Sequence, residues 1–424
     1  MPELSLNALW ILIVFIIGYA CITLEHWTKF NKAAVALLMA AIMWILLFLA
    51  PVCKEDGTNV SCFLEHLSGI SQIIFFLMGA LTIVELININ HGFQLISNYI
   101  NVTSKRRLLW VMGILTFFLS SILDNLTTTI VMVTLLRKLL NKDEDRLLIG
   151  GGIVIAANAG GAWTPIGDVT TTMLWIGGQV TSYAIIRDLF FPSVICVVVA
   201  LTMLSFFLKG DCCKVPQKDE KPVDANGKTV FTLGILALVF VPVFKVLTGL
   251  PPVMGILFGL SVLWLVTDWF HWRTGNLHRQ VPDAFSKIDL SSTFFFLGIL
   301  LSVDVLDLAN LLDRLAIWLD TTIDNVPLIA TLIGLFSAVV DNVPLVAASM
   351  SMYGILQHPV DSQFWELVAF CAGTGGSILI IGSAAGVVYM GLEKVDFFWY
   401  IKRISLPALL GYAAGILTYL YLEG

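Results

Sequence analysis

Charged residues are scarce in this sequence. Only 13% of its 424 residues are Asp, Glu, Lys or Arg, whereas ordinary soluble domains carry about 25%. Hydrophobic residues make up 58% of the chain, and its mean hydropathy is +0.89. The formal net charge is −6 and no basic stripe is present, which argues against a nucleic-acid partner. A long chain with so little charge is typical of a membrane protein.

Metal-binding cysteine patterns are missing as well. The seven cysteines have no metal-ligand spacing, and the adjacent Cys212 and Cys213 suit neither a zinc site nor an easy disulfide. Cys53 and Cys62 share one polar loop, and they either pair in an oxidising compartment or remain free thiols. The sequence also lacks a GxxxxGK(S/T) phosphate-binding loop, so we expect no ATP and no other cofactor.

Long apolar runs fill the chain, and most have the length of one helix that crosses a bilayer, about 20 residues. The first run has no basic residues before it and no small-residue cleavage site after it, so we interpret it as a membrane span. A polar stretch at 209–228 divides the chain near its middle, with six runs on each side. The runs are 7–24, 33–50, 69–88, 108–136, 147–180, 190–208, 229–248, 252–270, 291–306, 326–356, 364–390 and 404–422.

The two halves resemble each other in sequence. Three blocks match in the same order, at offsets of 219, 217 and 215 residues, which indicates an internal repeat. The matching blocks are "FFLMGALTIVEL" (75–86) with "FFFLGILLSVDV" (294–305), "SSILDN" (120–125) with "SAVVDN" (337–342), and "AGGAWTPIGD" (159–168) with "TGGSILIIGS" (374–383).

Basic residues predict that the two halves are inverted relative to each other. The 108–136 run has "KRR" before it and "RKLLNKDEDR" after it, so both of its flanks should be cytoplasmic. Its 29 residues are too few for two crossings, which need about 40, and we therefore expect a re-entrant hairpin. The matching run, 326–356, has no Lys or Arg in its flanks, so the second hairpin should enter from the opposite side.

The expected fold is an all-α polytopic membrane protein made of two inverted repeats, with both termini outside. Each repeat has five crossing segments, one re-entrant helical hairpin and one broken helix. The first repeat covers 1–208, with its hairpin at 108–136 and its broken helix at 147–180. A cytoplasmic linker covers 209–228. The second repeat covers 229–424, with its hairpin at 326–356 and its broken helix at 364–390.

Each hairpin carries an Asp-Asn pair in its apolar middle, Asp124-Asn125 and Asp341-Asn342. A charged carboxylate near the bilayer centre costs about 2.5–3.5 kcal/mol unless it is paired, hydrated or neutralised. Capping of the following helix is one explanation, but Ser or Asn would cap without a charge. We therefore predict that both tips reach the midplane and offer oxygen ligands to Na⁺, or hold a proton.

Glycine and proline interrupt two further runs at matching places. The first interruption has Gly160, Gly161 and Pro165, and the second has Gly375 and Gly376. Such breaks expose carbonyl and N–H groups to an ion, although close helix packing through small residues is the alternative for the glycines. Next to the first break lie Asn158, Asp168, Thr170 and Thr171. Since Ser383 stands where the first half has Asp168, we expect an asymmetric site.

A second pair of acids, Glu85 and Asp304, occupies equivalent positions late in two apolar runs. A proton relay and a solvated place at the membrane edge are both consistent with this position. The six histidines all lie near predicted ends of spans, where they either sense pH or serve as interfacial side chains.

The sequence resembles NhaD-type Na⁺/H⁺ antiporters, part of an ion transporter superfamily with arsenite exporters and sodium-coupled dicarboxylate carriers. The resemblance covers essentially the whole chain and is most specific at "SSILDNLTTT", "NAGGAWTPIGDVTTT", "VVDNVP" and "GTGGSILIIGSAAGV". It implies a transport domain of hairpins and broken helices that moves against a scaffold, in an elevator mechanism, usually within a homodimer. The dicarboxylate carriers have an uncharged Ser where Asp124 and Asp341 stand here, and the added negative charge favours a cation or proton.

The predicted function is secondary Na⁺(Li⁺)/H⁺ antiport, in which Asp124 and Asp341 bind cation and protons in alternation. The alternatives are transport of arsenite or of dicarboxylate with sodium, and, more distantly, an intramembrane aspartyl protease. The expected partners are Na⁺, H⁺, the lipid bilayer and a second copy of the chain, in a bacterial inner membrane, without enzymatic activity. The predicted ion- and proton-binding residues are Asp124, Asn125, Asp341, Asn342, Asp168, Asn158, Thr170, Thr171, Thr374 and Ser377.

Overall fold

A computed structural model describes residues 6–23, 25, 29–49, 59–97, 102, 104–140, 144–210, 225–274 and 281–423. Within these ranges the chain forms α-helices, with one π-helical turn and no β-strand. The expected all-α fold is therefore confirmed. The hypothesis of a Cys53–Cys62 disulfide falls on Cys53, which lies outside the described residues.

The helices follow the two halves of the sequence. The first half contains α1 (Leu6–Thr23), α3 (Lys32–Phe48), α4 (Asn59–Ile89), α5 (Gln94–Ser97), α6 (Lys105–Ser120), α7 (Asn125–Leu139), α8 (Glu144–Ala162), α9 (Val169–Ile176) and α10 (Ser182–Phe207). The second half contains α11 (Ala225–Thr248), α12 (Pro252–Thr274), α13 (Val281–Phe285), α14 (Leu290–Leu308), α15 (Leu311–Ile323), α16 (Val326–Phe336), α17 (Asn342–Met352), α18 (Gln363–Gly375), α19 (Ala384–Glu393), α20 (Phe397–Tyr400), the π-helical turn Ile401–Ser405 and α21 (Leu406–Glu423).

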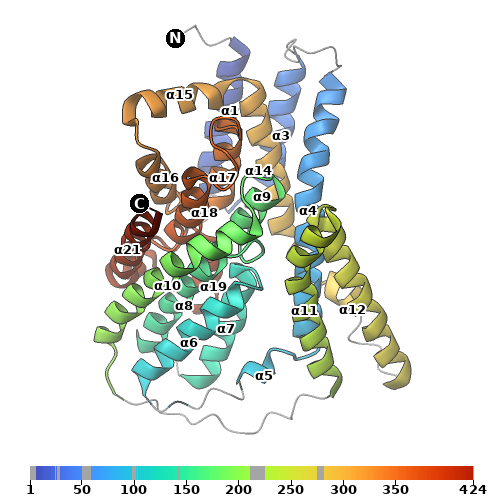
Figure 1. Cartoon of the computed structure of the whole chain (residues 1–424), viewed down its shortest axis with the longest axis vertical. Coiled ribbons are helices and arrows are strands. Elements are labelled where there is room, and N and C mark those ends of the chain that lie inside the picture. Colours follow the sequence, from blue (N-terminus) through green and yellow to red (C-terminus); the bar gives the residue numbers. More distant parts are fainter. Residues whose placement is uncertain are drawn as a thin grey trace.

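Seven helical stretches in the described ranges are long and apolar enough to cross a membrane. They are Leu6–Thr23, Val60–Ile89, Ser182–Phe207, Ala225–Thr248, Pro252–Phe270, Leu290–Leu308 and Phe397–Glu423. Helix α15 was not predicted from the sequence. It lies across the upper end of the molecule (Figure 1).

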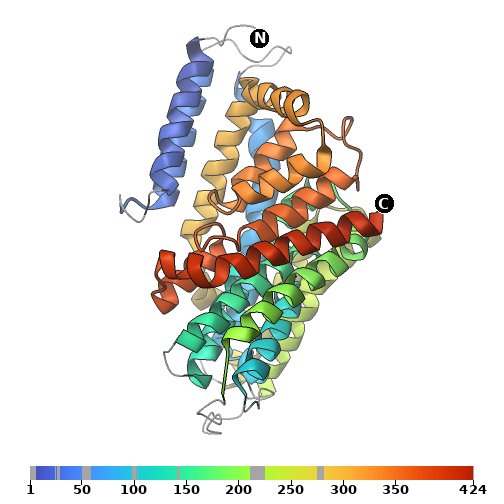
Figure 2. The same cartoon turned by 90° about the vertical axis from the view of Figure 1, so that its left-hand side faces the viewer.

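Two groups of helices can be distinguished (Figure 1). The first, which we call the frame, consists of α1, α3, α4, α11, α12 and α14; in it α14 packs on α3 and α4, and α4 packs on α11 and α12. The second, which we call the core bundle, consists of α6–α10, α16–α19 and α21. Figure 2 shows α1 at one edge of the molecule and α21 crossing its middle. The groups meet where α17 packs on α14 and α9 packs on α4.

The core bundle contains four helix interruptions, which position the polar residues. The first tip (121–124) separates α6 from α7, and the first break (163–168) separates α8 from α9. The second tip (337–341) separates α16 from α17, and the second break (376–383) separates α18 from α19. In every case the helix that follows starts with a side-chain cap, because Asp and Ser oxygens accept hydrogen bonds from free backbone N–H groups. These caps are Asp124, Asp168, Asp341 and Ser383.

Matching contacts recur in the two halves. The Ser120 hydroxyl, beside the first tip, donates to the Ala157 carbonyl of α8 over 2.7 Å. The Ser337 hydroxyl, at the second tip, donates to the Ala372 carbonyl of α18 over 2.8 Å. Each bond ties a tip to the helix that runs into the neighbouring break. The internal repeat seen in the sequence is thus accompanied by repeated local geometry.

The glycines of the first interruption differ from the expectation. Gly160 and Gly161 lie inside the last turn of α8, whereas Pro165 lies in the first break itself. A Cβ at Gly160 would overlap the backbone carbonyl of Phe117 in α6. These glycines therefore allow close packing between backbones, which was the alternative explanation for them, and they do not themselves end the helix.

The second half also has two glycines in close contact with neighbouring backbone, and they lie directly at the second break. Gly375 is the last residue of α18, and Gly376 is its C-cap. A Cβ at Gly375 would overlap the carbonyl of Gly334 in α16, and one at Gly376 would lie 2.8 Å from the carbonyl oxygen of Gly382. Small residues are required at both points because backbone atoms, which cannot rotate away, occupy the space.

Candidate functional site

Asp168 lies at the centre of the polar residues that the core bundle brings together. Its side chain caps α9 and is 2% exposed. The amide of Asn125, the first residue of α7, donates to Asp168 Oδ2 over 3.2 Å. The amide of Asn342, the first residue of α17, donates to the same oxygen over 3.3 Å. Two residues 217 positions apart in the sequence, one from each tip, thus converge on one carboxylate oxygen.

Asn158 extends this contact to the second break. It is fully buried in α8, and its Oδ1 accepts a hydrogen bond from the Asn125 amide over 3.0 Å. Its own amide donates to the hydroxyls of Ser377, at 2.8 Å, and Ser383, at 2.9 Å. We call Asn125, Asn158, Asp168, Asn342, Ser377 and Ser383 the polar network. It joins both tips and both breaks.

The two tip carboxylates flank the polar network. Asp124 accepts from the backbone N–H of Thr127 over 2.8 Å and from its hydroxyl over 2.6 Å. Asp341 accepts from the backbone N–H of Val343 over 3.4 Å. Asp168 interacts electrostatically with both of these carboxylates. One buried and two half-buried carboxylates therefore lie in or beside the polar network, where a cation or protons lower the electrostatic free energy.

The threonines of the first half divide into bonded and unbonded hydroxyls. The hydroxyls of Thr128 and Thr129 are buried and have no hydrogen-bond partner among the described residues. Thr170 follows the Asp168 cap, and its backbone N–H donates to Asp168 Oδ1 over 3.3 Å. A buried hydroxyl without a partner costs free energy, so these oxygens are available to a water or an ion.

Two other predicted ligands have protein partners already. The Thr171 hydroxyl donates to the Asp168 carbonyl over 2.9 Å. The Thr374 hydroxyl donates to the carbonyl of Phe370, one turn earlier in α18, over 2.6 Å. Both residues are buried near the breaks, but their hydroxyls stabilise local backbone and lie outside the polar network.

A pair of adjoining cavities leads to Asp124. The inner cavity, of about 60 Å³, is lined by Asp124 and Asn125, by residues of α4 and by Asp289. The outer cavity, of about 260 Å³, is lined by Glu85, Lys138 and Lys287 among others. Residues of α4 and α7 and Asp289 line both cavities. Solvent therefore approaches the first tip from the end of the molecule where Lys138 and Lys287 lie.

A third cavity, of about 390 Å³, lies toward the other ends of α4 and α14 and is lined by His66 and Asp304. The described residues that line it include Met173, Ile176 and Met350, and none of them belongs to the polar network. Apolar side chains of α9 and α17 therefore separate this cavity from the polar network.

Glu85 and Asp304, the two acids for which a proton relay was considered, lie apart from the polar network. Glu85 lines the outer cavity and accepts from the Asn88 amide, at 3.1 Å for the shorter contact. Asp304 lines the third cavity, and its Oδ2 lies 3.1 Å from His66 Nδ1. The structure thus places one of these acids at each solvent entrance.

Three groups of residues near the site were not predicted as site residues from the sequence. Ser383 was recognised as the counterpart of Asp168 but not as a hydrogen-bond partner of Asn158, although its match with Asp168 in the repeat was a signal that it belongs to the site. Thr128 and Thr129 belong to a Thr run next to a predicted tip, which was the available signal. Lys32 was not among the predicted site residues; its Nζ lies 3.9 Å from Asp341 Oδ2, a tertiary contact that no sequence pattern indicates.

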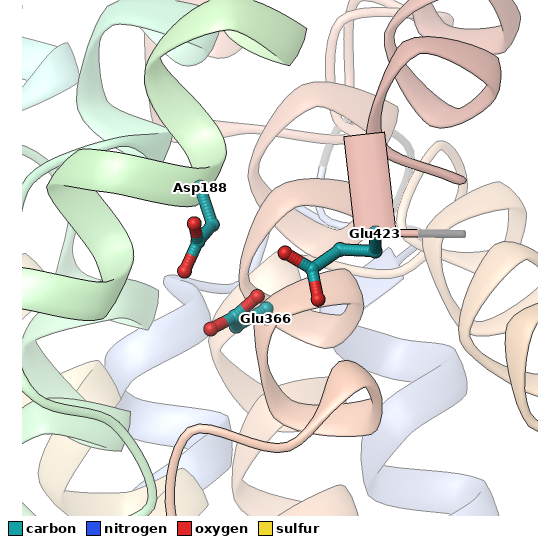
Figure 3. A group of neighbouring side chains, drawn as sticks. All are labelled: Asp188, Glu366 and Glu423. Atoms are coloured by element: carbon teal, nitrogen blue, oxygen red, sulfur yellow. The ribbon is translucent and has the colours of Figure 1, made fainter. Parts of the chain in front are cut away.

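A further acidic cluster lies outside the polar network. Asp188 of α10, Glu366 of α18 and Glu423 of α21 point toward one another (Figure 3), with one oxygen from each within 4.8 Å of the others. Asp188 is paired with Arg187, and the Tyr419 hydroxyl donates to Glu366 over 2.6 Å. Because protein donors already bind two of the three acids, we assign the cluster no ligand.

Comparison of the sequence with known proteins identifies its family. The profile of the CitMHS family, described as "Citrate transporter", matches residues 10–367. Sodium/proton antiporter 1 of Arabidopsis thaliana is 53% identical over 96% of this chain and 71% of its own length. Sodium/proton antiporter 2 of the same plant is 51% identical over 96% of this chain and 98% of its own length.

Bacterial proteins match over the same extent. The Na⁺/H⁺ antiporter NhaD of Vibrio cholerae is 30% identical over 97% of this chain and 91% of its own length. NhaD of Alkalimonas amylolytica is 29% identical over 97% of this chain. All of these relatives are transporters and not enzymes. The chain therefore belongs to the CitMHS family of membrane transporters and, within it, to the sodium/proton antiporters of the NhaD type.

Proposed function

We propose that this protein exchanges Na⁺ or Li⁺ for protons across a membrane. The observation that carries the proposal is the convergence of Asn125 and Asn342 on Asp168, with Asp124 and Asp341 on either side. Carboxylate, amide and backbone oxygens at broken helices are the ligands that Na⁺ and H⁺ use in transporters of this architecture. The names of the similar plant and bacterial proteins support the same ions.

In this proposal Na⁺ and protons compete for one group of carboxylates. Asp124 and Asp341 bind cation and protons in alternation, and Asp168 holds the two asparagines so that their amide oxygens face the ion. The Thr170 hydroxyl, next to the Asp168 cap, adds a neutral oxygen. Because the carboxylates are buried, leaving them all charged and empty is unfavourable, which makes movement of the empty site rare. Exchange then follows without ATP.

We further propose that the core bundle moves relative to the frame as an elevator between two inverted repeats. The repeated Ser120 and Ser337 contacts support this view. The solvent access also supports it. Two cavities reach Asp124 from the end of the molecule where Lys138 and Lys287 lie, whereas apolar side chains lie between the polar network and the third cavity. The structure would then represent the state open toward the basic, cytoplasmic end.

The finer placement in the cell stays a prediction. The relatives come from a plant and from bacteria, so the bacterial inner membrane expected from the sequence remains a prediction. Both termini outside, the boundaries of the repeats and the homodimer are likewise predictions. Labelling of single cysteines from each side of the membrane tests the position of the termini. Mass determination of the purified protein tests the homodimer.

Citrate transport is the second candidate, because the family is described by that substrate. Citrate carries several negative charges at neutral pH, and the buried carboxylates of Asp124, Asp168 and Asp341 would repel it. In the described residues, the hydrogen bonds of the polar network come from amides and hydroxyls rather than from Lys or Arg. This chemistry favours a cation. The aspartyl protease alternative is excluded because the relatives are transporters.

The decisive experiment measures ion-driven proton movement in proteoliposomes that contain the purified protein and an internal pH dye. Addition of Na⁺ or Li⁺ to acid-loaded vesicles should release protons, while K⁺, citrate and arsenite should not. Asp124→Asn and Asp341→Asn should each abolish the response. Asp361→Asn serves as the matched control, because Asp361 lies in a loop where it binds the Thr181 hydroxyl. Proton release by citrate and not by Na⁺ would contradict the proposal.

A further inference from the structure

Lys32 stands beside one of the two tip carboxylates. Its Nζ lies 3.9 Å from Asp341 Oδ2 and 4.5 Å from the centre of the Phe295 ring. The two side chains of this ion pair are 22% and 16% exposed, so water reaches both. Lys32 is the first residue of α3, and the Asn31 cap fixes the start of that helix by accepting from the Ala33 N–H over 2.8 Å. The charge is thus held in place by the frame.

The corresponding place beside Asp124 has no such lysine. Helix α12 corresponds to α3, since Gly298 of α14 packs against Ala36 of α3 in the way that Gly79 of α4 packs against Ile256 of α12. The first residue of α12 is Pro252, where α3 has Lys32. Ile256 and Asp124 line the same inner cavity, so the start of α12 is near the first tip. At this described position the two halves therefore differ in charge, with Lys32 at the start of α3 and Pro252 at the start of α12.

We propose that Lys32 is a tethered cation that competes with Na⁺ for Asp341, so that Asp341 releases its lysine each time it takes an ion. This inference rests on the proposed function and adds a specificity-determining residue to it. The ammonium group and Na⁺ both carry one positive charge and both need the same carboxylate oxygen. With Lys32 in place Asp341 is already neutralised, and Na⁺ binds there only by displacing it.

The same pair restrains the empty protein. Asp341 belongs to the second tip, in the core bundle, whereas Lys32 belongs to the frame. An Asp341 without bound ion or proton stays attracted to Lys32, which keeps the second tip beside α3. Binding of Na⁺ or of a proton removes that attraction, because the carboxylate is then neutralised from within the core bundle. Lys32 therefore opposes movement of an empty site.

The test is equilibrium binding of radioactive ²²Na⁺ to the purified protein in detergent, at one fixed alkaline pH. Lys32→Gln should bind Na⁺ about fivefold more tightly than the wild type, the amount expected when one partly exposed ion pair no longer competes. Lys32→Arg, which keeps the charge, should retain the weaker binding of the wild type. A tightening cannot arise from damage to the fold, since misfolded protein binds less Na⁺.

Lys29→Gln is the matched control. Lys29 precedes the same helix, carries the same charge and is exposed, and its removal should leave Na⁺ binding unchanged. Equal or weaker binding by Lys32→Gln, when the wild type binds Na⁺, would overturn the role of Lys32 and leave the antiport proposal standing. Equal tightening by Lys29→Gln would overturn it too, because the effect would then be one of general charge. Absence of Na⁺ binding by the wild type would overturn both proposals.

Discussion

At the scale of single residues, the carboxylate of Asp168 organises the site more than either tip carboxylate. One of its oxygens accepts from both Asn125 and Asn342, and the other accepts from the backbone of Thr170. Hydrogen bonds to a charged acceptor are stronger than neutral ones, by about a factor of two. The negative charge of Asp168 thus fixes the amide groups of Asn125 and Asn342.

Replacement of Asp168 by Asn tests this role. We expect Asp168→Asn to lower Na⁺-driven proton release at least about tenfold, since the loss of a charged acceptor costs about 1.5–3 kcal/mol and each 1.4 kcal/mol is a factor of ten. The near-identical shape of Asn should keep the protein folded. The measurement is the initial rate in proteoliposomes at several Na⁺ concentrations, beside Asp188→Asn from the separate acidic cluster. A wild-type rate in Asp168→Asn would show that its charge is dispensable.

The individual site residues could be recognised from the sequence, but their mutual contacts could not. Asp124, Asn125, Asp168 and Asn342 stood out because charged and amide side chains are costly in apolar runs. That Asn125 and Asn342 donate to one oxygen depends on how two tips approach each other in space. The pairing of Lys32 with Asp341 depends in addition on the packing of α3 against α14.

At the scale of elements, caps and glycines determine where the core helices stop. Gly, Pro and Asp positions indicated interruptions near 124, 165, 341 and 375, because such residues disfavour a continuous helix. The exact roles of the glycines were not visible in the sequence. Gly160 continues a helix and accommodates a neighbouring backbone, which follows only from the proximity of α6. Helix α15 was missed because its mixed polar and apolar residues do not form an apolar run.

Gly375→Ala tests the close approach of α18 to α16. A Cβ at this position would overlap the Gly334 carbonyl, and because backbone cannot rotate away, we expect a loss of stability of about 1–3 kcal/mol. The measurement is thermal unfolding of the purified protein. Gly391→Ala in α19 is the control, since no atom lies within 4 Å of the added carbon and Ala favours a helix. If both variants unfold at the same temperature, the space at Gly375 is larger than described.

At the scale of the whole molecule, contacts of several kinds connect the frame with the core bundle. Lys245 of α11 donates to the carbonyl of Trp175, near the end of α9, over 2.8 Å and lies 4.5 Å from the centre of its ring. The rings of Phe76 in α4 and Trp175 are 6.5 Å apart. With the Lys32–Asp341 pair and the packing of α17 on α14, these contacts join the two groups.

Covalent linkage between the two groups should stop transport if the core bundle moves. We expect a short bismaleimide bridge between Lys245→Cys and Ile176→Cys to reduce Na⁺-driven proton release at least about tenfold, since many transporters require one bundle to move against the other. The same reagent on Phe240→Cys with Phe258→Cys, both within the frame and with rings 6.3 Å apart, should leave most of the rate. Transport that survives the first bridge would exclude such a movement.

The separate locations of the acids and the lysine have an electrical consequence. If the core bundle moves, the carboxylates of Asp124, Asp168 and Asp341 travel with it while Lys32 stays behind. A membrane voltage does work of about 2.3 kcal/mol per 100 mV on each elementary charge that crosses the full field. The voltage would therefore act on the unoccupied form and hardly on a form whose carboxylates are neutralised. Exchange rates measured under potassium diffusion potentials of either sign would show whether the form that moves still carries net charge, because only a charged form responds.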